Sequence, residues 1–486
     1  MTAVPFGDYR PDIADLDTQF TKSLTNVLPR ADGYGPFPDF SSYTGALPAA
    51  CRGFFIGRKT DGSVAVFAGT STKLYILDAT ALTWTDASLG SGVYAALSST
   101  DQWQFAQFGN FVLATQANAV LQEFDLTSST NFANTAGSPP QAKYISIVNR
   151  FVLLTGLTSN PYRIQWSGLN DRTNWTSGIN SSDFQDFPDG GVVRGSAGGE
   201  YGIVFQDAAI RRMTYTPGNP VIFIIERIAE DHGLYAPYSL IKTSDKIFYL
   251  SPHGFETLTP TSPPVPIGKE RVDRTFLADL DKGNLQLLLG AADPRSSRVY
   301  WAYKSNSGTA GLFDKIICYD WALQRFSPIT VSGEYLASIS QPGLTLESLD
   351  NISGSLDALP FSLDDVATSV TPEIAAVNSA HKLGFFRGLN LEATLDTAEQ
   401  NGAGQRFFVQ GYRVLADAPT VYGSISYREN QSGTASQLAE STMNARGFVP
   451  LRRSTRYARG RIRIPAATIW TYANGLEPEF TSAGRR

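Results

Sequence analysis

The sequence predicts an all-β protein, namely a β-propeller that carries an extended N-terminal arm and a C-terminal antiparallel β domain of sandwich-like form. Of the 486 residues, 42% are hydrophobic and 17% are charged, below the roughly 25% charged that is usual in soluble domains, which excludes a disordered chain. The 43 glycines, 27 prolines and 12% aromatic residues favour short strands and turns over long helices. A short motif that ends in an aromatic residue also recurs along the chain.

Residues 1–45 predict an extended arm. This segment is rich in proline, glycine and aromatic residues and has neither helical nor alternating periodicity. Proline removes backbone donors, so the segment cannot form a core by itself. Its aromatic residues Tyr34, Phe37, Phe40 and Tyr43 are too many to leave in water. We therefore expect the arm to lie along another surface, in the same subunit or in a neighbour.

Residues 46–340 predict the propeller. Apolar side chains alternate at Val64, Val66 and Ala68, and the preceding Asp61-Gly62 pair marks a hairpin turn. In the recurring motif, a strand ends in Asp or Asn and an aromatic residue follows five to seven positions later. The four copies are Asp78 with Trp84, Asp125 with Phe132, Asn170 with Trp175, and Asp320 with Phe326.

The motif has a physical rationale in radially repeated sheets. Asp or Asn bonds to the backbone two residues on and stabilises the turn, while the aromatic ring covers the gap between neighbouring sheets. The spacing of roughly 45 residues between the first three copies favours a propeller with inserted loops over a sandwich. Four copies do not define the number of blades.

The last third of the sequence predicts two further parts. Residues 341–380 form an acidic linker in which prolines interrupt an irregular leucine pattern, and residues 381–486 return to strand-like alternation and predict the C-terminal β platform domain. Only short helices are expected in the chain, for example over residues 272–280.

Charge is distributed unevenly although the net charge is only −5. Residues 341–380 contain no Lys or Arg and six acids: Glu347, Asp350, Asp357, Asp364, Asp365 and Glu373. Residues 441–463 contain no acid and seven arginines: Arg446, Arg452, Arg453, Arg456, Arg459, Arg461 and Arg463. The two segments are electrostatic complements.

Strand alternation places Arg459, Arg461 and Arg463 on one face of a strand, and Ile462 and Ile464 on the other. Three interpretations are open for this arginine stripe: a solvated sheet face, an interface with the acidic segment of a neighbouring copy, or contact with phosphate. As interface candidates, we expect Arg452, Arg453, Arg456 and the stripe to form ion pairs with acidic residues of the linker. Those acids are Glu347, Asp350, Asp364 and Asp365.

Catalytic and metal-binding patterns are not recognisable in the sequence. Gly195-Ser196-Ala197-Gly198 lacks the spacing of a hydrolase nucleophile elbow. The three histidines, His232, His253 and His381, are far apart in sequence and have no zinc-ligand spacing. We therefore expect no enzyme, no cofactor and no metal site.

The two cysteines and the start of the chain also carry predictions. Cys51 and Cys318 lie in apolar, strand-like segments, and we therefore expect both to be buried free thiols. Apolar runs are too short to span a membrane, and the first 15 residues lack the pattern of a secretory signal.

Three stretches of the chain resemble a family of phage virion proteins. They are NVLPRADGYGPFPDFSSY, FVLLTGLTSNPYRIQWSGLNDRTNWTSG with SSDFQDFPDGG, and RYARGRIRIPAATIWTYANGLE. Together they resemble the tail nozzle, or tail hub, of short-tailed (podovirus-type) bacteriophages and related prophages. In that family a β-propeller is attached to a β-rich platform domain.

The resemblance implies a structural protein of the virion tail, assembled in the bacterial cytoplasm as a homohexameric ring. Its implied partners are the head-to-tail adaptor, tail fibres or spikes, and double-stranded DNA in transit during ejection. The arginine stripe and the acidic segment would help to close the ring, and the N-terminal arm would contact a neighbour. The alternative is a monomeric propeller that binds or hydrolyses glycans of the host surface.

Overall fold

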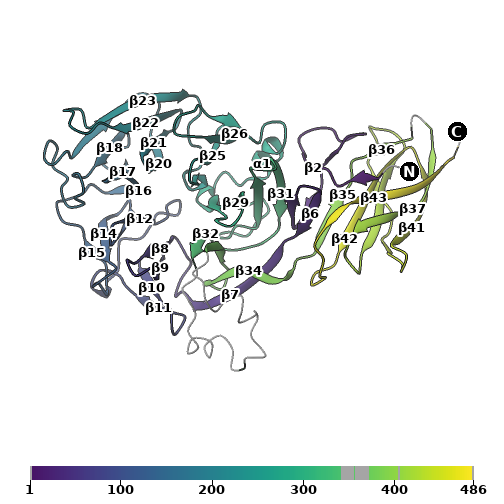
Figure 1. The fold of residues 1–486 in the computed structure, drawn as a ribbon, viewed down its shortest axis with the longest axis horizontal. Coiled ribbons are helices and arrows are strands. Elements are labelled where there is room, and N and C mark those ends of the chain that lie inside the picture. The colour runs from purple at the N-terminus through teal and green to yellow at the C-terminus, as the bar shows by residue number, and fades with distance from the viewer. Residues whose placement is uncertain (1–2, 341–354, 356–371, 403–404, 484–486) are drawn as a thin grey trace.

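Seven four-stranded antiparallel sheets form the blades of a β-propeller, and two larger sheets lie beside it (Figure 1). This computed structural model describes residues 3–340, 355, 372–402 and 405–483. The predicted propeller is confirmed, and within the described residues it has seven blades.

Each of the first six blades uses consecutive strands, here given in chain order. The first blade consists of β8 (Phe54–Arg58), β9 (Val64–Gly69), β10 (Leu74–Asp78) and β11 (Thr83–Asp86). The second consists of β12 (Gln104–Phe108), β13 (Phe111–Gln116), β14 (Ala119–Asp125) and β15 (Ala133–Asn134). The third consists of β16 (Ala142–Val148), β17 (Phe151–Leu157), β18 (Arg163–Trp166) and β19 (Asp183–Asp186).

The next three blades follow the same pattern. The fourth consists of β20 (Val193–Ala197), β21 (Tyr201–Gln206), β22 (Ala209–Tyr215) and β23 (Phe223–Glu230). The fifth consists of β24 (Ile241–Lys242), β25 (Ile247–Ser251), β26 (Gly254–Leu258) and β27 (Val265–Pro266). The sixth consists of β28 (Leu289–Ala292), β29 (Arg298–Tyr303), β30 (Lys315–Asp320) and β31 (Arg325–Ile329).

The seventh blade combines both ends of the propeller sequence. Its strand order is β32 (Tyr335–Ser340), β33 (Pro372–Val377), β34 (Lys382–Asn390) and β7 (Pro38–Ala46). The fourth strand therefore comes from the N-terminal segment, and its pairing with β34 closes the ring. The first strand, β32, contacts β8 of the first blade.

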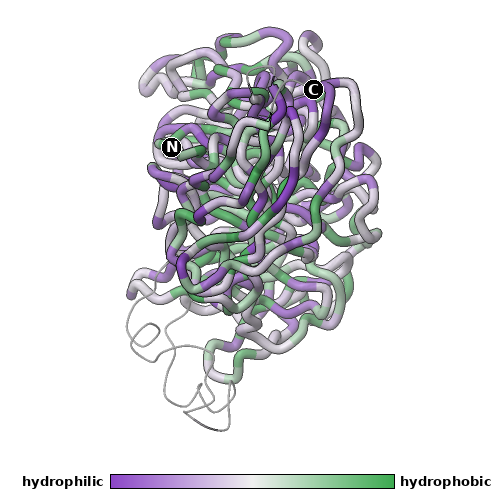
Figure 2. Tube along the Cα trace, turned by 90° about the vertical axis from the view of Figure 1, so that its right-hand side faces the viewer, coloured by the Kyte–Doolittle hydropathy of each residue, from purple (hydrophilic) through white to green (hydrophobic). Residues whose placement is uncertain are grey.

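Packing between blades explains why the second strands of the blades are apolar on both faces. Strands such as β9 and β17 are buried almost throughout, because each lies between two neighbouring sheets. The buried apolar residues form seven clusters that each join two adjacent blades, and an eighth in the two larger sheets. In agreement, Figure 2 shows hydrophobic segments interleaved with hydrophilic ones along the whole molecule.

The two larger sheets form a second unit, here called the two-sheet domain. Its six-stranded sheet contains β1 (Val4–Pro5), β5 (Val27–Arg30), β6 (Gly33–Pro36), β37 (Phe407–Ala416), β41 (Phe448–Thr455) and β43 (Ala473–Ser482). Its seven-stranded sheet contains β4 (Leu24–Thr25), β35 (Ala393–Asp396), β36 (Gln400–Asn401), β38 (Tyr422–Arg428), β39 (Ser436–Gln437), β40 (Ser441–Thr442) and β42 (Tyr457–Ile464). Both sheets contribute to one core cluster.

The N-terminal segment lies along surfaces of its own subunit, which is one of the two placements predicted for the extended arm. Four of its strands join the two-sheet domain, and β7 joins the propeller. A short parallel pair, β2 (Asp8–Tyr9) with β3 (Phe20–Thr21), lies between these parts. Tyr34 and Phe37 are buried. The proline-rich segment thus obtains its backbone hydrogen bonds from strands of the same chain.

The domain boundaries differ from the predicted ones, because strands from outside the predicted propeller range complete the seventh blade. The propeller takes in residues 38–46 and 372–390 around its predicted range of 46–340. Residues 372–377 of the predicted acidic linker form β33, and most of the remaining linker lies outside the described residues. In the C-terminal part of the chain, β35 is the first strand that belongs to the two-sheet domain.

Helices in the described chain are few and short, and none is long and apolar enough to cross a membrane. They are α1 (Asp273–Asp279) and the 3₁₀ turns η1 (Leu89–Ser91), η2 (Pro237–Ser239) and η3 (Leu285–Leu287). The predicted helix over 272–280 is confirmed as α1.

The N-terminal segment supplies the cap that α1 lacks. Val272 precedes the helix and offers no side-chain acceptor. Instead the Asp12 carboxylate accepts hydrogen bonds from the backbone N–H groups of Arg274 and Thr275, each at 2.8 Å. A carboxylate at this position also interacts favourably with the helix dipole. Asp12 therefore anchors the N-terminal segment to the propeller.

We predict that Asp12→Ala lowers the free energy of unfolding by about 1–2 kcal/mol, because two helix N–H groups lose their acceptor. Urea denaturation would measure the loss. The matched control is Asp32→Ala, because the Asp32 side chain is exposed. This substitution should change the free energy of unfolding by no more than about 0.5 kcal/mol. Equal losses for the two variants would contradict the capping role.

Asp273 at the start of α1 is a buried carboxyl group with incomplete hydrogen bonding. Its Oδ1 accepts a bond from the backbone N–H of Phe255 at 3.1 Å, whereas Oδ2 has no partner. Burial raises the pKa of Asp273 to about 7, and the charges of Asp12 and Glu256 act in the same direction. The folded protein therefore binds this proton more tightly than the unfolded chain does.

This difference predicts a pH dependence of stability. The contribution of Asp273 is fully present below its unfolded pKa, near 4, and is lost as the pH rises through about 7. Relative to Asp273→Asn, the wild type should lose a few kcal/mol of unfolding free energy over this interval, since each tenfold difference in proton affinity corresponds to about 1.4 kcal/mol. Urea denaturation at several pH values tests this. Parallel curves for the two proteins would refute it.

Candidate interaction surface

The arginine stripe lies on β42 as strand alternation predicts. Ile462 and Ile464 point into the core and are fully buried, while Arg459, Arg461 and Arg463 lie on the opposite face and are partly exposed. The face of β42 was therefore predicted correctly.

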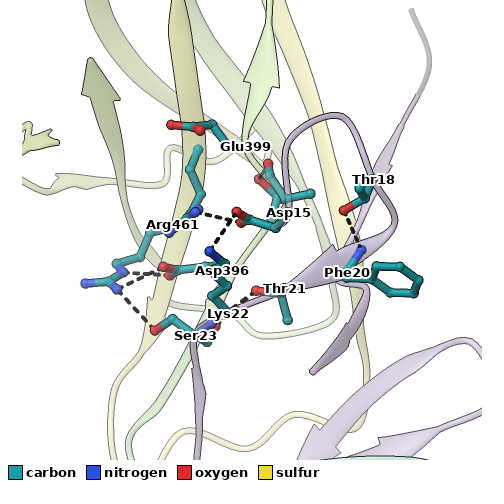
Figure 3. A network of polar contacts seen from close by, with 12 residues as sticks. Asp15, Thr18, Phe20, Thr21, Lys22, Ser23, Asp396, Glu399 and Arg461 are labelled. Atoms are coloured by element: carbon teal, nitrogen blue, oxygen red, sulfur yellow. Dashed lines mark hydrogen bonds and ion pairs between the residues drawn. The ribbon is translucent and has the colours of Figure 1, made fainter. Parts of the chain in front are cut away.

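Arg461 forms the central ion pair of the stripe (Figure 3). Its Nε and Nη2 donate to the two carboxylate oxygens of Asp396 at 2.6 and 2.9 Å. The two residues are directly opposite each other on β42 and β35. Burial raises the pKa of Asp396, and Arg461 opposes that shift. The pair is thus a planar, two-bond contact with its acid side chain inside the protein.

The other two arginines of the stripe also have partners in the same chain. Arg459 donates to Asp15 of the N-terminal segment at 2.6 Å. Arg463 contacts Glu440 at 2.7 Å and Glu392 at 3.0 Å.

Within the described residues, the partners of the stripe lie in its own subunit and not in the acidic segment predicted for it. All three guanidinium groups are paired with carboxylates of their own subunit. The sequence did not reveal these partners, because Asp15 and Asp396 are 444 and 65 residues away from the arginines they bind. The charges within residues 441–463 do not indicate which acidic residues elsewhere in the chain lie next to these arginines.

The remaining arginines of the segment are in a different situation. Arg446, Arg452, Arg453 and Arg456 are exposed, and none of them forms an ion pair with any described residue. Their predicted acidic partners lie outside the described residues: Glu347, Asp350, Asp364 and Asp365. We call these four arginines the arginine surface.

The four copies of the sequence motif lie between the third and fourth strands of blades one, two, three and six. Asp78, Asp125 and Asp320 each accept hydrogen bonds from backbone N–H groups two or three residues on. Their aromatic partners Phe132 and Phe326 are buried between blades. Trp84 is half-buried and donates to the carbonyl oxygen of Gly45 on β7 at 3.2 Å.

The third copy differs in which residue stabilises the turn. Asn170 adopts a positive φ of 57°. The acceptor is the next residue, Asp171, which binds the backbone N–H and the hydroxyl group of Thr173 at 2.8 and 2.7 Å. Trp175 is buried and donates to the carbonyl oxygen of Arg172. The motif is therefore displaced by one residue in this blade.

The axis of the propeller contains a cavity of about 280 Å³. Inner strands of several blades line it, and Tyr144, Tyr238 and Tyr335 contribute to its wall. The rings of Tyr144 and Tyr238 pack with their centroids 6.2 Å apart. Aromatic side chains thus narrow the propeller axis.

A second cavity, of about 490 Å³, opens between the two sheets of the two-sheet domain. Phe407, Val409, Ile425 and Leu476 line its apolar part. The volume is in the range of small-molecule sites. These four residues, however, belong to the hydrophobic core between the two sheets.

The cysteines and histidines have structural partners. Cys51 and Cys318 are buried free thiols, as predicted, and burial raises the pKa of each to about 12. The rings of His232 and His253, distant in sequence, lie 6.1 Å apart, and His381 contacts Glu334 at 2.6 Å. Across the described chain, no group of three or more His, Cys, Asp and Glu could hold a metal ion.

One exposed apolar pair lies where the propeller meets the two-sheet domain. Leu389 is 67% exposed and Ile469 is 81% exposed. Their backbones are close, because Asn390 donates from its side chain to the carbonyl oxygen of Thr468 at 2.9 Å and accepts a bond from the N–H of Ala467 at 2.8 Å. We call Leu389 and Ile469 the apolar pair.

Comparison with known proteins finds remote structural similarity. No family model matches the chain, and no curated protein matches its sequence. Among solved structures, the chain is similar to a chain of the Mitotic Checkpoint Complex, with 10% identity, a TM-score of 0.40, and coverage of 74% of this chain and 94% of the other.

Two further similar structures are BamB from Moraxella catarrhalis and the Pan2 WD40 domain of Neurospora crassa. BamB is 14% identical, with a TM-score of 0.37 over 74% of this chain and 92% of that chain. The Pan2 domain is 9% identical, with a TM-score of 0.38 over 63% of this chain and 90% of that chain.

The paired and unpaired arginines should differ in their effect on stability. We predict that Arg461→Met lowers the unfolding free energy by about 3 kcal/mol, because it leaves the buried Asp396 carboxylate without its partner. Arg452→Met on β41, in the other sheet of the two-sheet domain, should change it by less than about 0.5 kcal/mol, since Arg452 is exposed and unpaired among the described residues. Urea denaturation measures both, and similar losses would count against the internal ion pair.

Proposed function

We propose that the protein is a structural component of a phage tail: the nozzle subunit of a short-tailed bacteriophage or related prophage. In this role six copies form a ring below the head-to-tail adaptor, conduct DNA during ejection and hold tail fibres. The sequence resemblance supports the proposal, and its first and third stretches come together in one sheet, where Tyr34 of β6 pairs with Ala473 of β43.

The connection between the domains suits a protein that bears mechanical load. Strands β7 and β34, from which the chain leads into the two-sheet domain, pair within blade seven, from Pro38 opposite Asn390 to Ala46 opposite Lys382. Asn26 adds a second connection, because it donates to the carbonyl oxygen of Glu392 and accepts from the N–H of Thr330 at the end of the sixth blade. Hydrogen-bonded strands transmit force between the domains better than a flexible linker does.

The path of DNA in this proposal lies between copies and not through the propeller. The cavity on the propeller axis measures about 280 Å³ and is narrowed by tyrosines. This volume is slightly below the roughly 300–1,000 Å³ of small-molecule sites and is far too small for duplex DNA. A conduit would therefore be the central opening of a ring.

The observation that carries an assembly of copies is the apolar pair. Leu389 and Ile469 are large aliphatic side chains, 67% and 81% exposed, on two adjacent backbone segments. Large exposed apolar side chains next to polar surroundings are typical of protein–protein contacts where they form one patch. Burying both side chains against another copy would contribute about 1.5–3 kcal/mol each.

We predict that the purified protein forms particles with six times the 52.7 kDa mass of one chain, measured by mass photometry and seen as rings by negative-stain electron microscopy. The double variant Leu389→Ser and Ile469→Ser should raise the concentration for half-assembly at least tenfold without lowering the melting temperature. The control is Val93→Ser, whose side chain is 69% exposed on the propeller.

The alternative is a monomer that binds or hydrolyses host glycans. A wild-type protein that remains monomeric at all concentrations and binds glycans would contradict the ring proposal. If the double variant assembles like the wild type, the ring proposal stands but the apolar pair is not one of the contacts between copies.

A further inference from the structure

The arginine surface has a local structural cause. Val409 of β37 pairs with Arg453 of β41, and Gly411 pairs with Pro450, so β41 contains one extra residue between these two positions. Such a bulge breaks the strict alternation of side chains. Arg452 and Arg453 are consequently both exposed although they are neighbours in a strand.

The surface also carries an uncompensated charge. Arg446, Arg452, Arg453 and Arg456 have no carboxylate partner among the described residues. Arg453 packs 4.0 Å above the ring of Tyr427, which holds its guanidinium group in place. Arg452 and Arg453 are adjacent on β41 and Arg456 lies just beyond its end, and like charges so close in the chain repel one another unless an anion binds them.

The chain contains a segment whose charge complements that of the arginine surface. Of the six acids in residues 341–380, Glu373 is already bound by Arg295 and Arg387. The segment 341–371 contains the other five acids and no Lys or Arg: Glu347, Asp350, Asp357, Asp364 and Asp365. Five carboxylates thus complement four arginines.

We propose that the arginine surface of one copy binds the acidic segment 341–371 of a second copy. This inference rests on the proposed ring and names one of its contacts. The segment begins after Ser340 and ends before Pro372, which pair with each other in blade seven. Strand β41 lies at the opposite end of the molecule from the propeller (Figure 1). A neighbouring copy, in contrast, can bring its propeller next to β41.

A charge exchange between two chains tests the contact. The arginine variant carries Arg452→Glu, Arg453→Glu and Arg456→Glu; the acid variant carries Asp350→Lys, Asp357→Lys, Asp364→Lys and Asp365→Lys. Each alone should raise the concentration for half-assembly at least tenfold at physiological salt, while the melting temperature stays that of the wild type. An equimolar mixture should restore assembly, because in an alternating ring every contact is again complementary.

The control variant reverses three exposed cations of the propeller that form no ion pair with described residues, namely Arg58→Glu, Lys59→Glu and Arg150→Glu. It should assemble like the wild type. If it fails as the arginine variant does, the effect is one of net charge and the inference is wrong.

Four other outcomes would overturn the inference. Wild-type rings formed by the arginine variant would leave the nozzle proposal intact and remove this contact. Failure of the mixture, with recovery in a chain that carries both sets of substitutions, would show that the segment binds its own copy. Normal assembly of the arginine variant with weakened binding of labelled duplex DNA would assign the surface to phosphate. A wild type that is always monomeric would contradict both proposals.

Cysteine cross-linking offers an independent measurement. Arg456→Cys in one chain and Asp357→Cys in another should give a disulfide-linked dimer when the two are mixed under mild oxidation. The native thiols of Cys51 and Cys318 do not compete, since both are buried. Absence of the mixed dimer from assembled particles would contradict the contact.

Discussion

Strands β7 and β34 pair antiparallel in blade seven, so that their main-chain hydrogen bonds close the propeller, and the chain connects both strands directly to the two-sheet domain through β6 and β35. The seventh blade has no fourth strand without the N-terminal segment. Because the ring of inter-blade cores is continuous from blade one to blade seven, every blade depends on this closure. The same segment continues into β5 and β6, which complete the second domain.

Electrostatic contacts follow the same arrangement. Asp15 binds Arg459 of the two-sheet domain, Asp12 caps α1 of the propeller, and Asp8 contacts Arg325 of the sixth blade at 2.7 Å. The N-terminal segment therefore supplies carboxylates to cations of both domains. Its low periodicity reflects this role, because its side chains serve several different surfaces in succession.

Much of the architecture could be predicted from the sequence. The Asp-to-aromatic motif correctly indicated a propeller, because a carboxylate-stabilised turn between the third and fourth strands recurs in several blades. The helix at 272–280 and the buried thiols were also predicted correctly. The motif did not give the blade count, since blades four, five and seven end in other turns and blade seven draws its last strand from residues 38–46.

For the candidate surface, the sequence by itself determined which charges exist and which side of a strand they occupy, because alternation is a local property of the backbone. The tertiary structure decided which charges remain available. Arg459, Arg461 and Arg463 are neutralised by Asp15, Asp396, Glu392 and Glu440, whereas Arg452, Arg453 and Arg456 have no carboxylate partner among the residues that the structure describes. Pairing depends on distances between segments far apart in the chain, and only the fold brings such segments together.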